Sequence, residues 1–190
     1  KFEKSLGVYG LNEIMDEEGE IIPIIADGDD SDLKESDFPR ELPILSLRNN
    51  VLFPGVVLPI SIGRPKSIKL IRDVYNKDRI VGTVAQKDPE IDDPLFEDLH
   101  KVGTIGQIVK LLEMPDGSTT AIIQGKRRIE LTEKVTENPY IISKIQLCKD
   151  IFPKDKSKDF EAIVGSLKDM SLRMIKINPT ISQEASFAIK

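Results

Sequence analysis

The residues best suited to nucleophilic or acid–base chemistry in this chain are its single histidine, His100, and its single cysteine, Cys148. A serine hydrolase needs a serine, a histidine and a carboxylate that converge, and the sequence contains no G-x-S-x-G turn to present the serine. A reactive cysteine needs neighbours that favour its thiolate, and no His or Asn pattern accompanies Cys148. We therefore predict no catalytic residue in this chain.

Four carboxylates, Asp92, Asp93, Glu97 and Asp98, could supply oxygen ligands to a cation. They lack the D-x-D-x-D-G loop with a terminal Glu that binds calcium, so we interpret them as a solvated loop and predict no metal site. A phosphate-binding G-x-x-x-x-G-K-[ST] loop is also missing from the sequence. We predict that this chain holds no cofactor.

Two groups of basic residues could contact a partner. The run 126–128 (KRR) is short, and nucleic-acid binding needs a wider basic footprint with stacking aromatics, so a charged hairpin face explains it more simply. Arg64, Lys66 and Lys69 lie near the start of a predicted helix, where cations oppose the helix dipole. This local penalty makes them candidate substrate-binding or partner-binding residues; the alternative is an ordinary solvated helix face.

Residues 42–64 organise the chain and predict two strands joined by a turn. The first strand shows alternating apolar and polar residues, and Asn49-Asn50 is a turn signal because asparagine tolerates left-handed backbone geometry. In the second strand, 56–62, the even-numbered residues form one face. Pro59 cannot donate to a ladder, so this strand should lie at an edge or carry a bulge.

The following residues predict one helix and then a series of short strands. The helix begins at Pro65, whose missing N–H costs nothing there, and ends near 77–78. The Asp116-Gly117 pair predicts a hairpin turn. The expected strands are 79–86, 104–114, 119–125, 127–135 and 140–147, with a loop at 87–101. This spacing favours an α+β fold with a compact β barrel or sandwich over 39–150.

The C-terminal part, 151–190, has a different pattern and predicts helices. A charged linker precedes apolar residues spaced 3, 4, 3, 4, 3, which is a heptad-like seam: Phe160, Ile163, Leu167, Met170, Met174 and Ile177. Asn178-Pro179 should end this helix, and a second one, from Ser182, is cut off after about two turns. We interpret the segment as the truncated start of a helical bundle. Its seam would be completed by further residues or by a partner helix.

The net charge of −5 over 190 residues is distributed unevenly. Residues 13–41 hold twelve acidic and two basic residues, a balance of −10, which leaves +5 on the remainder. Such a self-repelling stretch predicts a disordered extension over 1–38, in which the IIPII run at 21–25 is a candidate docking segment. The sequence shows no membrane span or secretory signal, and a single cysteine predicts a reducing compartment.

Several segments resemble, in order and spacing, the N-terminal domain of Lon proteases. They are PILSLRNNVLFPG (43–55), LPISIGR (58–64), GRPKSI (63–68), VAQKDP (84–89), DLHKVGTIGQI (98–108), MPDG (114–117) and QGKRRI (124–129). The resemblance covers 42–190 and implies a PUA-like β barrel followed by a helical bundle. It leaves the acidic extension outside the common pattern.

The resemblance implies a non-catalytic domain of a bacterial, cytoplasmic, ATP-dependent serine protease. Such a domain recognises unfolded, damaged or degron-bearing proteins and supports assembly of a hexamer. The Ser-Lys dyad, the AAA+ module and the ATP and Mg that it uses would lie outside this chain. No membrane contact is expected, and nucleic-acid binding is disfavoured. The alternative from another class is a stand-alone PUA-like module that binds RNA or protein.

Overall fold

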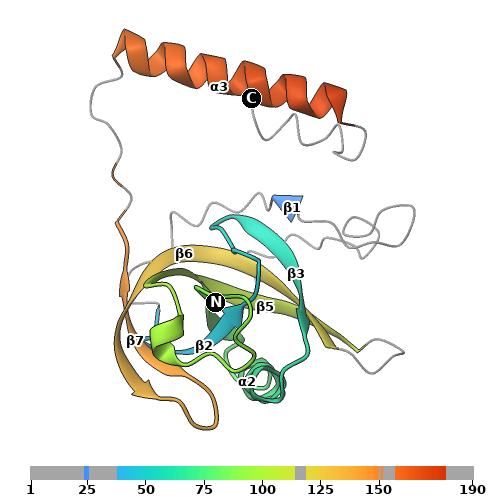
Figure 1. The fold of residues 1–190 in the computed structure, drawn as a ribbon, viewed down its shortest axis with the longest axis vertical. Helices are drawn as coiled ribbons and strands as arrows, with labels where there is room; N and C mark the ends of the chain where they lie inside the picture. Colours follow the sequence, from blue (N-terminus) through green and yellow to red (C-terminus); the bar gives the residue numbers. More distant parts are fainter. Residues whose placement is uncertain (1–23, 26–37, 114–118, 150, 152–156, 179–190) are drawn as a thin grey trace. The chain divides into compact units, whose positions relative to one another are not determined.

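The computed structural model describes residues 24–25, 38–113, 119–149, 151 and 157–178. The chain divides into two compact units, Lys1–Lys149 and Asp150–Lys190. The described part of the second unit consists mainly of the helix α3 (Lys158–Ile177). The first unit, shown with it in Figure 1, holds β1 (Ile24–Ile25), β2 (Glu41–Leu47), β3 (Val56–Ile62), α2 (Pro65–Tyr75), β4 (Ile80–Ala85), the short 3-10 helix η4 (Phe96–Asp98), β5 (Val102–Glu113), β6 (Thr119–Thr136) and β7 (Ile142–Leu147).

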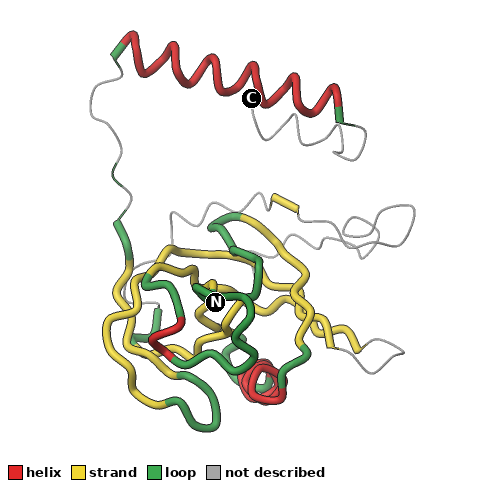
Figure 2. The backbone as a smooth tube through the Cα atoms, in the orientation of Figure 1, coloured by secondary structure: helices red, strands yellow, loops and turns green. Residues whose placement is uncertain are grey.

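Five strands of the first unit close into a ring in the order β6–β5–β4–β2–β7, and β7 pairs back onto β6. The ring can close because β6 is long: its first residues, 119–124, pair with β3, and its later residues, 129–136, pair with β7. The strands curve around the unit in Figure 2. The predicted α+β barrel with one early helix is confirmed.

Two large clusters of buried side chains lie one on each face of β2 and β4, and a small third cluster contains Val57 and Ile122. The inner core draws residues from all five ring strands, such as Ile44, Val84 and Ile129. The helix-side core lies on the opposite face, where Ile71 of α2 meets residues such as Leu45. β2 and β4 are a parallel pair covered on both faces, and apolar side chains such as Ile44 and Leu45 of β2 are accordingly buried on each face.

β6 is one strand where the sequence predicted two, 119–125 and 127–135. The break that the sequence indicated is a β-bulge: Gly106 of β5 pairs with Gly125 and the neighbouring Ile105 pairs with Arg127, so Lys126 is the extra residue. Such a bulge reverses which residues face each side of a strand. The run 126–128 therefore lies inside a strand, with Lys126 buried and Arg128 exposed. Its predicted place between two strands was wrong, and the predicted exposed charge holds for Arg128 but not for Lys126.

β3 confirms the placement of Pro59 at an edge. Within the described residues, β6 pairs with Val57–Ile62 of β3, whereas on the other side β1 pairs only with Val56 and Val57. The sequence predicted that only the even-numbered residues of this strand face the core. Val57 is buried as well and packs against Ile122. The pairing of Ile24–Ile25 also departs locally from the predicted disorder of 1–38.

The ends of α2 and α3 follow their sequence signals closely. α2 begins at Pro65 and ends at Tyr75, slightly before the predicted 77–78. Beyond it the backbone leaves the helical pattern: the N–H groups of Lys77 and Arg79 both donate to the Val74 carbonyl, at 3.0 and 3.1 Å, and Arg79 has φ +61°. Ser157 caps the start of α3, and Asn178 ends it as predicted. The predicted hairpin turn at Asp116-Gly117, the helix from Ser182 and most of the extension 1–38 lie outside the described residues.

Candidate functional site

The loop between β2 and β3, residues 48–55, presents apolar side chains to solvent. We call it the apolar loop. Its backbone alternates, so that Leu52 is 2% exposed and packs in the helix-side core, while Val51 and Phe53 on either side are 54% and 57% exposed. One buried anchor therefore fixes two outward-facing apolar side chains.

Backbone contacts hold the apolar loop against the sheet. The Thr104 hydroxyl donates to the Leu52 carbonyl at 2.7 Å, and the Gly55 N–H donates to the Gly125 carbonyl at 2.9 Å. Gly55 has φ +78°, a conformation that favours glycine. Gly125 allows the close approach, since a Cβ there would overlap the Phe53 carbonyl. The loop is thus a fixed platform for its exposed side chains.

A cavity of about 360 Å³ opens beside the apolar loop, lined in part by Val51, Leu52, His100 and Val102. Val102 is itself 51% exposed. We call Val51, Phe53 and Val102 the apolar rim. A fixed apolar rim beside a hollow can take up apolar side chains of a partner, because each contact removes apolar surface from water.

Sequence reasoning missed the apolar rim. The segment NNVLFPG was interpreted as turn punctuation, and its three consecutive apolar residues, 51–53, give no sign of which one is buried. The choice depends on the position of Thr104 and Gly125 in strands far along the chain. The only local signal was an unusually apolar stretch in a predicted turn.

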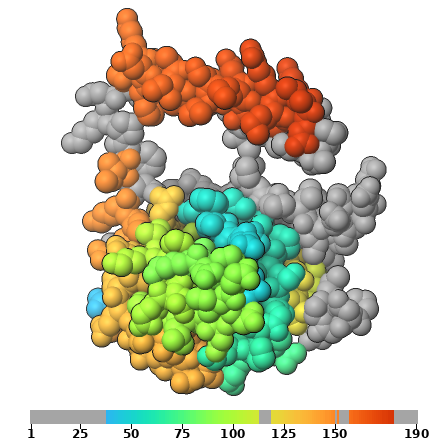
Figure 3. Space-filling view, viewed as in Figure 1, coloured from blue at the N-terminus to red at the C-terminus, as the bar shows by residue number. Residues whose placement is uncertain are grey.

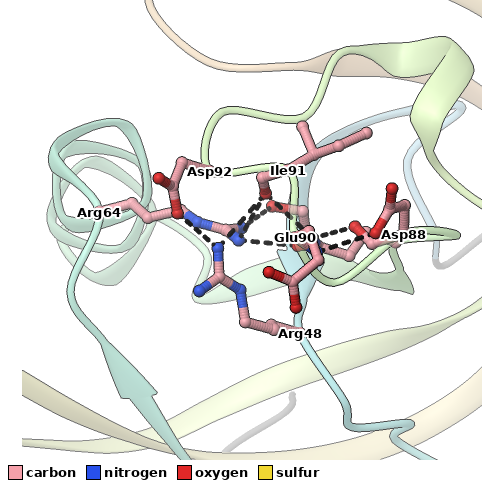
Figure 4. A network of polar contacts seen from close by, with 8 residues as sticks. Arg48, Arg64, Asp88, Glu90, Ile91 and Asp92 are labelled. Carbon is pink, nitrogen blue, oxygen red and sulfur yellow. Dashed lines mark hydrogen bonds and ion pairs between the residues drawn. The ribbon is translucent and has the colours of Figure 1, made fainter.

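A second cluster forms around Arg64, which precedes α2. Its Nη1 donates to Ser46 Oγ at 3.0 Å, and its Nη2 donates to Gln86 Oε1 at 2.8 Å and to the Ile91 carbonyl at 3.3 Å. Arg48 reaches the same place from the end of β2: its Nη2 donates to Asp92 Oδ1 at 2.7 Å and to the Ile91 carbonyl at 3.4 Å. Figure 4 shows the two arginines converging on the segment that carries Ile91 and Asp92.

This cluster fastens residues 88–93 (DPEIDD), which we call the acidic tip, to the barrel. The green surface around residue 90 faces the viewer in Figure 3, with the cyan surface around residue 50 next to it. Gln86 adds bonds from its Nε2 to the Asp88 carbonyl, 2.6 Å, and to the Ile91 carbonyl, 3.1 Å. The acidic tip is therefore held mainly by side chains.

The charged groups of the cluster shift one another's pKa values. Partial burial, and then repulsion from Arg48, lower the pKa of Arg64, although Asp92 and Asp93 act in the opposite direction. The hydrogen bond and the positive charge of Arg48 lower the pKa of the exposed Asp92 carboxyl. Two like charges thus lie close together: both arginines donate to the Ile91 carbonyl, and the Asp92 carboxylate is bonded to Arg48.

The three predicted binding residues, Arg64, Lys66 and Lys69, lie at the start of α2 but in different surroundings. Arg64 is half-buried in the cluster just described. Lys66 Nζ pairs with Asp93 at 2.6 Å, and Lys69 Nζ lies 3.8 Å from Asp73. Each lysine has a carboxylate neighbour, yet the side chains remain 41% and 55% exposed. The structure brings only Arg64 and Lys66 into contact with the acidic tip.

The four carboxylates of the 87–101 loop do not converge. Asp92 and Asp93 pair with Arg48 and Lys66, and Glu97 pairs with Lys134 at 3.1 Å. Asp98 accepts from the Leu95 N–H at 2.9 Å. Over the described ranges, no group of three or more His, Cys, Asp or Glu residues is arranged to hold a metal ion.

The remaining candidates lie apart from one another. His100 lines the cavity beside the apolar rim, and Cys148 is a half-buried residue just after β7. In the second unit, the predicted seam of α3 is exposed along its length, with Ile163 60% and Met170 62% exposed. No helix among the residues that the structure describes is long and apolar enough to cross a membrane.

Comparison with known proteins gives a consistent picture. The family model for the "ATP-dependent protease La (LON) substrate-binding domain" matches residues 41–190. The chain is 46% identical to the Lon protease of Flavobacterium johnsoniae over 93% of its own length and 22% of that protein. It is 42% identical to the Lon protease of Parabacteroides distasonis over 95% of its length and 22% of that protein. The chain thus spans about a fifth of these relatives.

Two solved structures share the fold. The N-terminal domain of a Mycobacterium avium complex Lon protease superposes with a TM-score of 0.60 at 16% identity, covering 78% of this chain and 74% of that one. A Lon N-terminal domain protein from Xanthomonas campestris gives a TM-score of 0.53 at 18% identity, covering 70% of this chain and 73% of that one. At these identities the likeness concerns the fold alone.

Proposed function

Because this chain belongs to the family of substrate-binding domains of the ATP-dependent protease La, or Lon, we propose that its barrel captures unfolded or degron-bearing proteins through the apolar rim. The observation that carries this proposal is the outward fixation of Val51 and Phe53 by the buried Leu52. The domain itself is non-catalytic in this proposal, and it presents clients to the rest of the protease.

The apolar rim suits a client that exposes apolar side chains. Native proteins bury most of their large apolar residues, whereas unfolded segments expose them, so an apolar contact favours the unfolded form. A fixed loop loses little conformational freedom on binding, which leaves more of the contact energy for affinity. Each contact is shallow, so several copies acting on one chain would add avidity.

The test is binding of the full 190-residue chain to a labelled, permanently unfolded protein, followed by fluorescence anisotropy. We expect the unfolded protein to bind and its native form to bind much less. The substitution Phe53→Ser should weaken binding about fivefold or more, since aromatic anchors at interfaces contribute over 1 kcal/mol. It should leave the fold intact, because the side chain is 57% exposed.

Val135→Ser provides the matched control, because Val135 is 45% exposed on β6 and does not belong to the rim. Its binding should stay at the level of the unmodified chain. Equal binding of native and unfolded proteins, or equal losses for Phe53→Ser and Val135→Ser, would refute capture through the rim. Tight and steeply salt-dependent binding of a single-stranded RNA, run in parallel, would favour the RNA-binding alternative.

Lys66 and Lys69 remain proposed polar contacts of the client or of a neighbouring subunit. Their ion pairs are exposed, and exposed pairs contribute only about 0–1 kcal/mol, so a partner can exchange with them. Reversing both charges belongs in the same anisotropy series. Weaker binding with an unchanged far-UV circular dichroism spectrum would support this role.

The proposal extends to the longer protein. We place this chain in a cytoplasmic, ATP-dependent serine protease that works as a hexamer. The site that binds ATP and Mg, and the catalytic Ser-Lys dyad, would lie outside residues 1–190. The exposed heptad seam of α3 supports a role in assembly, because apolar residues at this spacing pack well against another helix. Its partner is either a further segment of the same protein or another subunit.

A further inference from the structure

A cavity of about 370 Å³ is lined by residues of β2 and β3, by Arg48 and Asn50 of the loop between them, and by Arg64 and Ser67 at the start of α2. We call it the arginine pocket. Of the described residues that line it, two are arginines and none carries a carboxylate. Ser46, Asn50, Ser61 and Ser67 add neutral polar groups, and parts of β2 and β3 add apolar walls. Such a composition fits a small anionic group attached to an apolar body.

Arg48 has hydrogen-bonding capacity to spare. A guanidinium has five N–H donors, and within the described residues both bonds of Arg48 leave from Nη2. Its Nε and Nη1 donors thus have no protein partner there. The side chain is 43% exposed, and its ion pair with the 94% exposed Asp92 is of the weak surface type.

Arg64 supplies a positive charge that is fixed in place. Its three bonds go to neutral acceptors, Ser46 Oγ, Gln86 Oε1 and the Ile91 carbonyl, so its charge has no directly bonded carboxylate in the described part of the chain. Arg48, Arg64 and the bonded Asp92 together carry one net positive charge. An anion in the pocket would relieve the repulsion between the two guanidiniums.

We propose that the arginine pocket binds a carboxylate of an extended peptide, with Arg48 as the bidentate donor and Arg64 as the fixed second charge. The planar fork of a guanidinium matches a carboxylate, and one net positive charge suits a monoanion better than a phosphate dianion. The identification of the ligand as a peptide rests on the proposed function. The proposal of a carboxylate site does not. The source is either a C-terminus or an acidic side chain.

The test uses the full chain and three short probes, followed by chemical-shift changes of the Ser61, Gly63 and Ser67 amides at low salt. The probes are acetyl-Ala-Ala-Leu with a free carboxylate, the same tripeptide as its amide, and acetyl-Ala-Glu-Leu amide, whose only carboxylate is a side chain. We expect at least one carboxylate probe to bind about tenfold more tightly than the uncharged amide. Which of the two binds identifies the source.

Arg48→Gln should weaken the bound carboxylate probe about tenfold, whereas Lys77→Gln, which removes one charge from an exposed position just after α2, should change it less than about twofold. Equal binding of acid and amide, or no effect of Arg48→Gln, would overturn the site. Tighter binding of inorganic phosphate than of either carboxylate would overturn the ligand assignment. Phe53→Ser should leave probe binding intact, so failure of the pocket and failure of the apolar rim are distinguishable.

Discussion

The apolar loop, 48–55, and the acidic tip, 88–93, both cover the barrel but are held in opposite ways. The apolar loop is fixed by a buried leucine and by two hydrogen bonds of its backbone. The Leu52 carbonyl accepts from the Thr104 hydroxyl, and the Gly55 N–H donates to the Gly125 carbonyl. The acidic tip is fixed by long side chains that reach it from Arg48, Arg64 and Gln86. Core packing thus holds one loop, and charge and polar contacts hold the other.

Because of this difference, the two loops should respond differently to salt and pH. Burial of apolar groups is not weakened by ionic screening and does not depend on a titrating group, so the apolar rim should keep its form wherever the barrel is folded. Exposed ion pairs weaken with salt and disappear when a partner loses its charge. The two proposed sites therefore differ in character: the rim is constant, and the arginine pocket is adjustable.

The largest effect should come from removing the anchor of the apolar loop. Leu52→Ala should lower the free energy of unfolding by about 2–5 kcal/mol, because Leu52 is 2% exposed and its loss leaves a cavity in the helix-side core. Chemical denaturation measures this value. Phe53→Ala, one residue along and 57% exposed, should change it by less than about 0.5 kcal/mol. Similar losses for both variants would show that the loop does not hold its side chains as described.

A smaller effect is expected from the central residue of the acidic tip. Arg64→Gln should lower the free energy of unfolding by about 1–3 kcal/mol, because it removes three hydrogen bonds from a charged, half-buried donor. Hydrogen exchange should show faster opening at 86–91 and unchanged protection at 52–56.

Arg48 serves as the comparison for Arg64 in the same measurement of the free energy of unfolding. Since its ion pair is exposed, Arg48→Gln should cost less than about 1 kcal/mol. If Arg48→Gln proved as costly as Arg64→Gln, the acidic tip would depend on both arginines alike. The assignment of Arg64 as its central support would then fail.

The elements of the barrel were predictable wherever local periodicity decides. The strand 42–47 and the helix from Pro65 follow from alternating and helical spacing, and both are present. The continuity of β6 was not predictable, because the bulge at Lys126 is defined by its pairing with β5. Ring closure through the pairs of β6 with β7 is likewise a long-range property that local patterns do not contain.

The candidate sites show the same limit. The charge argument selected Arg64 as a residue of interest, but its partners Gln86 and Ile91 come from a loop more than twenty residues away, which spacing does not reveal. Val51 and Phe53 were not selected, because an apolar residue in a predicted turn looks the same whether it is buried or exposed. The exposure of these side chains depends on which strands lie beneath the loop. Local sequence patterns do not predict which strands those are.

The smallest effect is a pH response confined to the acidic tip. The hydrogen bond from Arg48 lowers the pKa of Asp92 below its ordinary value of 3.8, so the folded state binds this proton less readily than the unfolded state. The stabilising contact is therefore present above pH 3.8 and is lost as the pH falls through the lower, folded pKa. NMR titration of the Asp92 carboxyl should give a midpoint below 3.8, and Arg48→Gln should return it toward that value. Amides at 51–55 of the apolar loop, beyond Arg48 itself, should not follow this titration; a shared midpoint there would mean that the two loops are held as one unit.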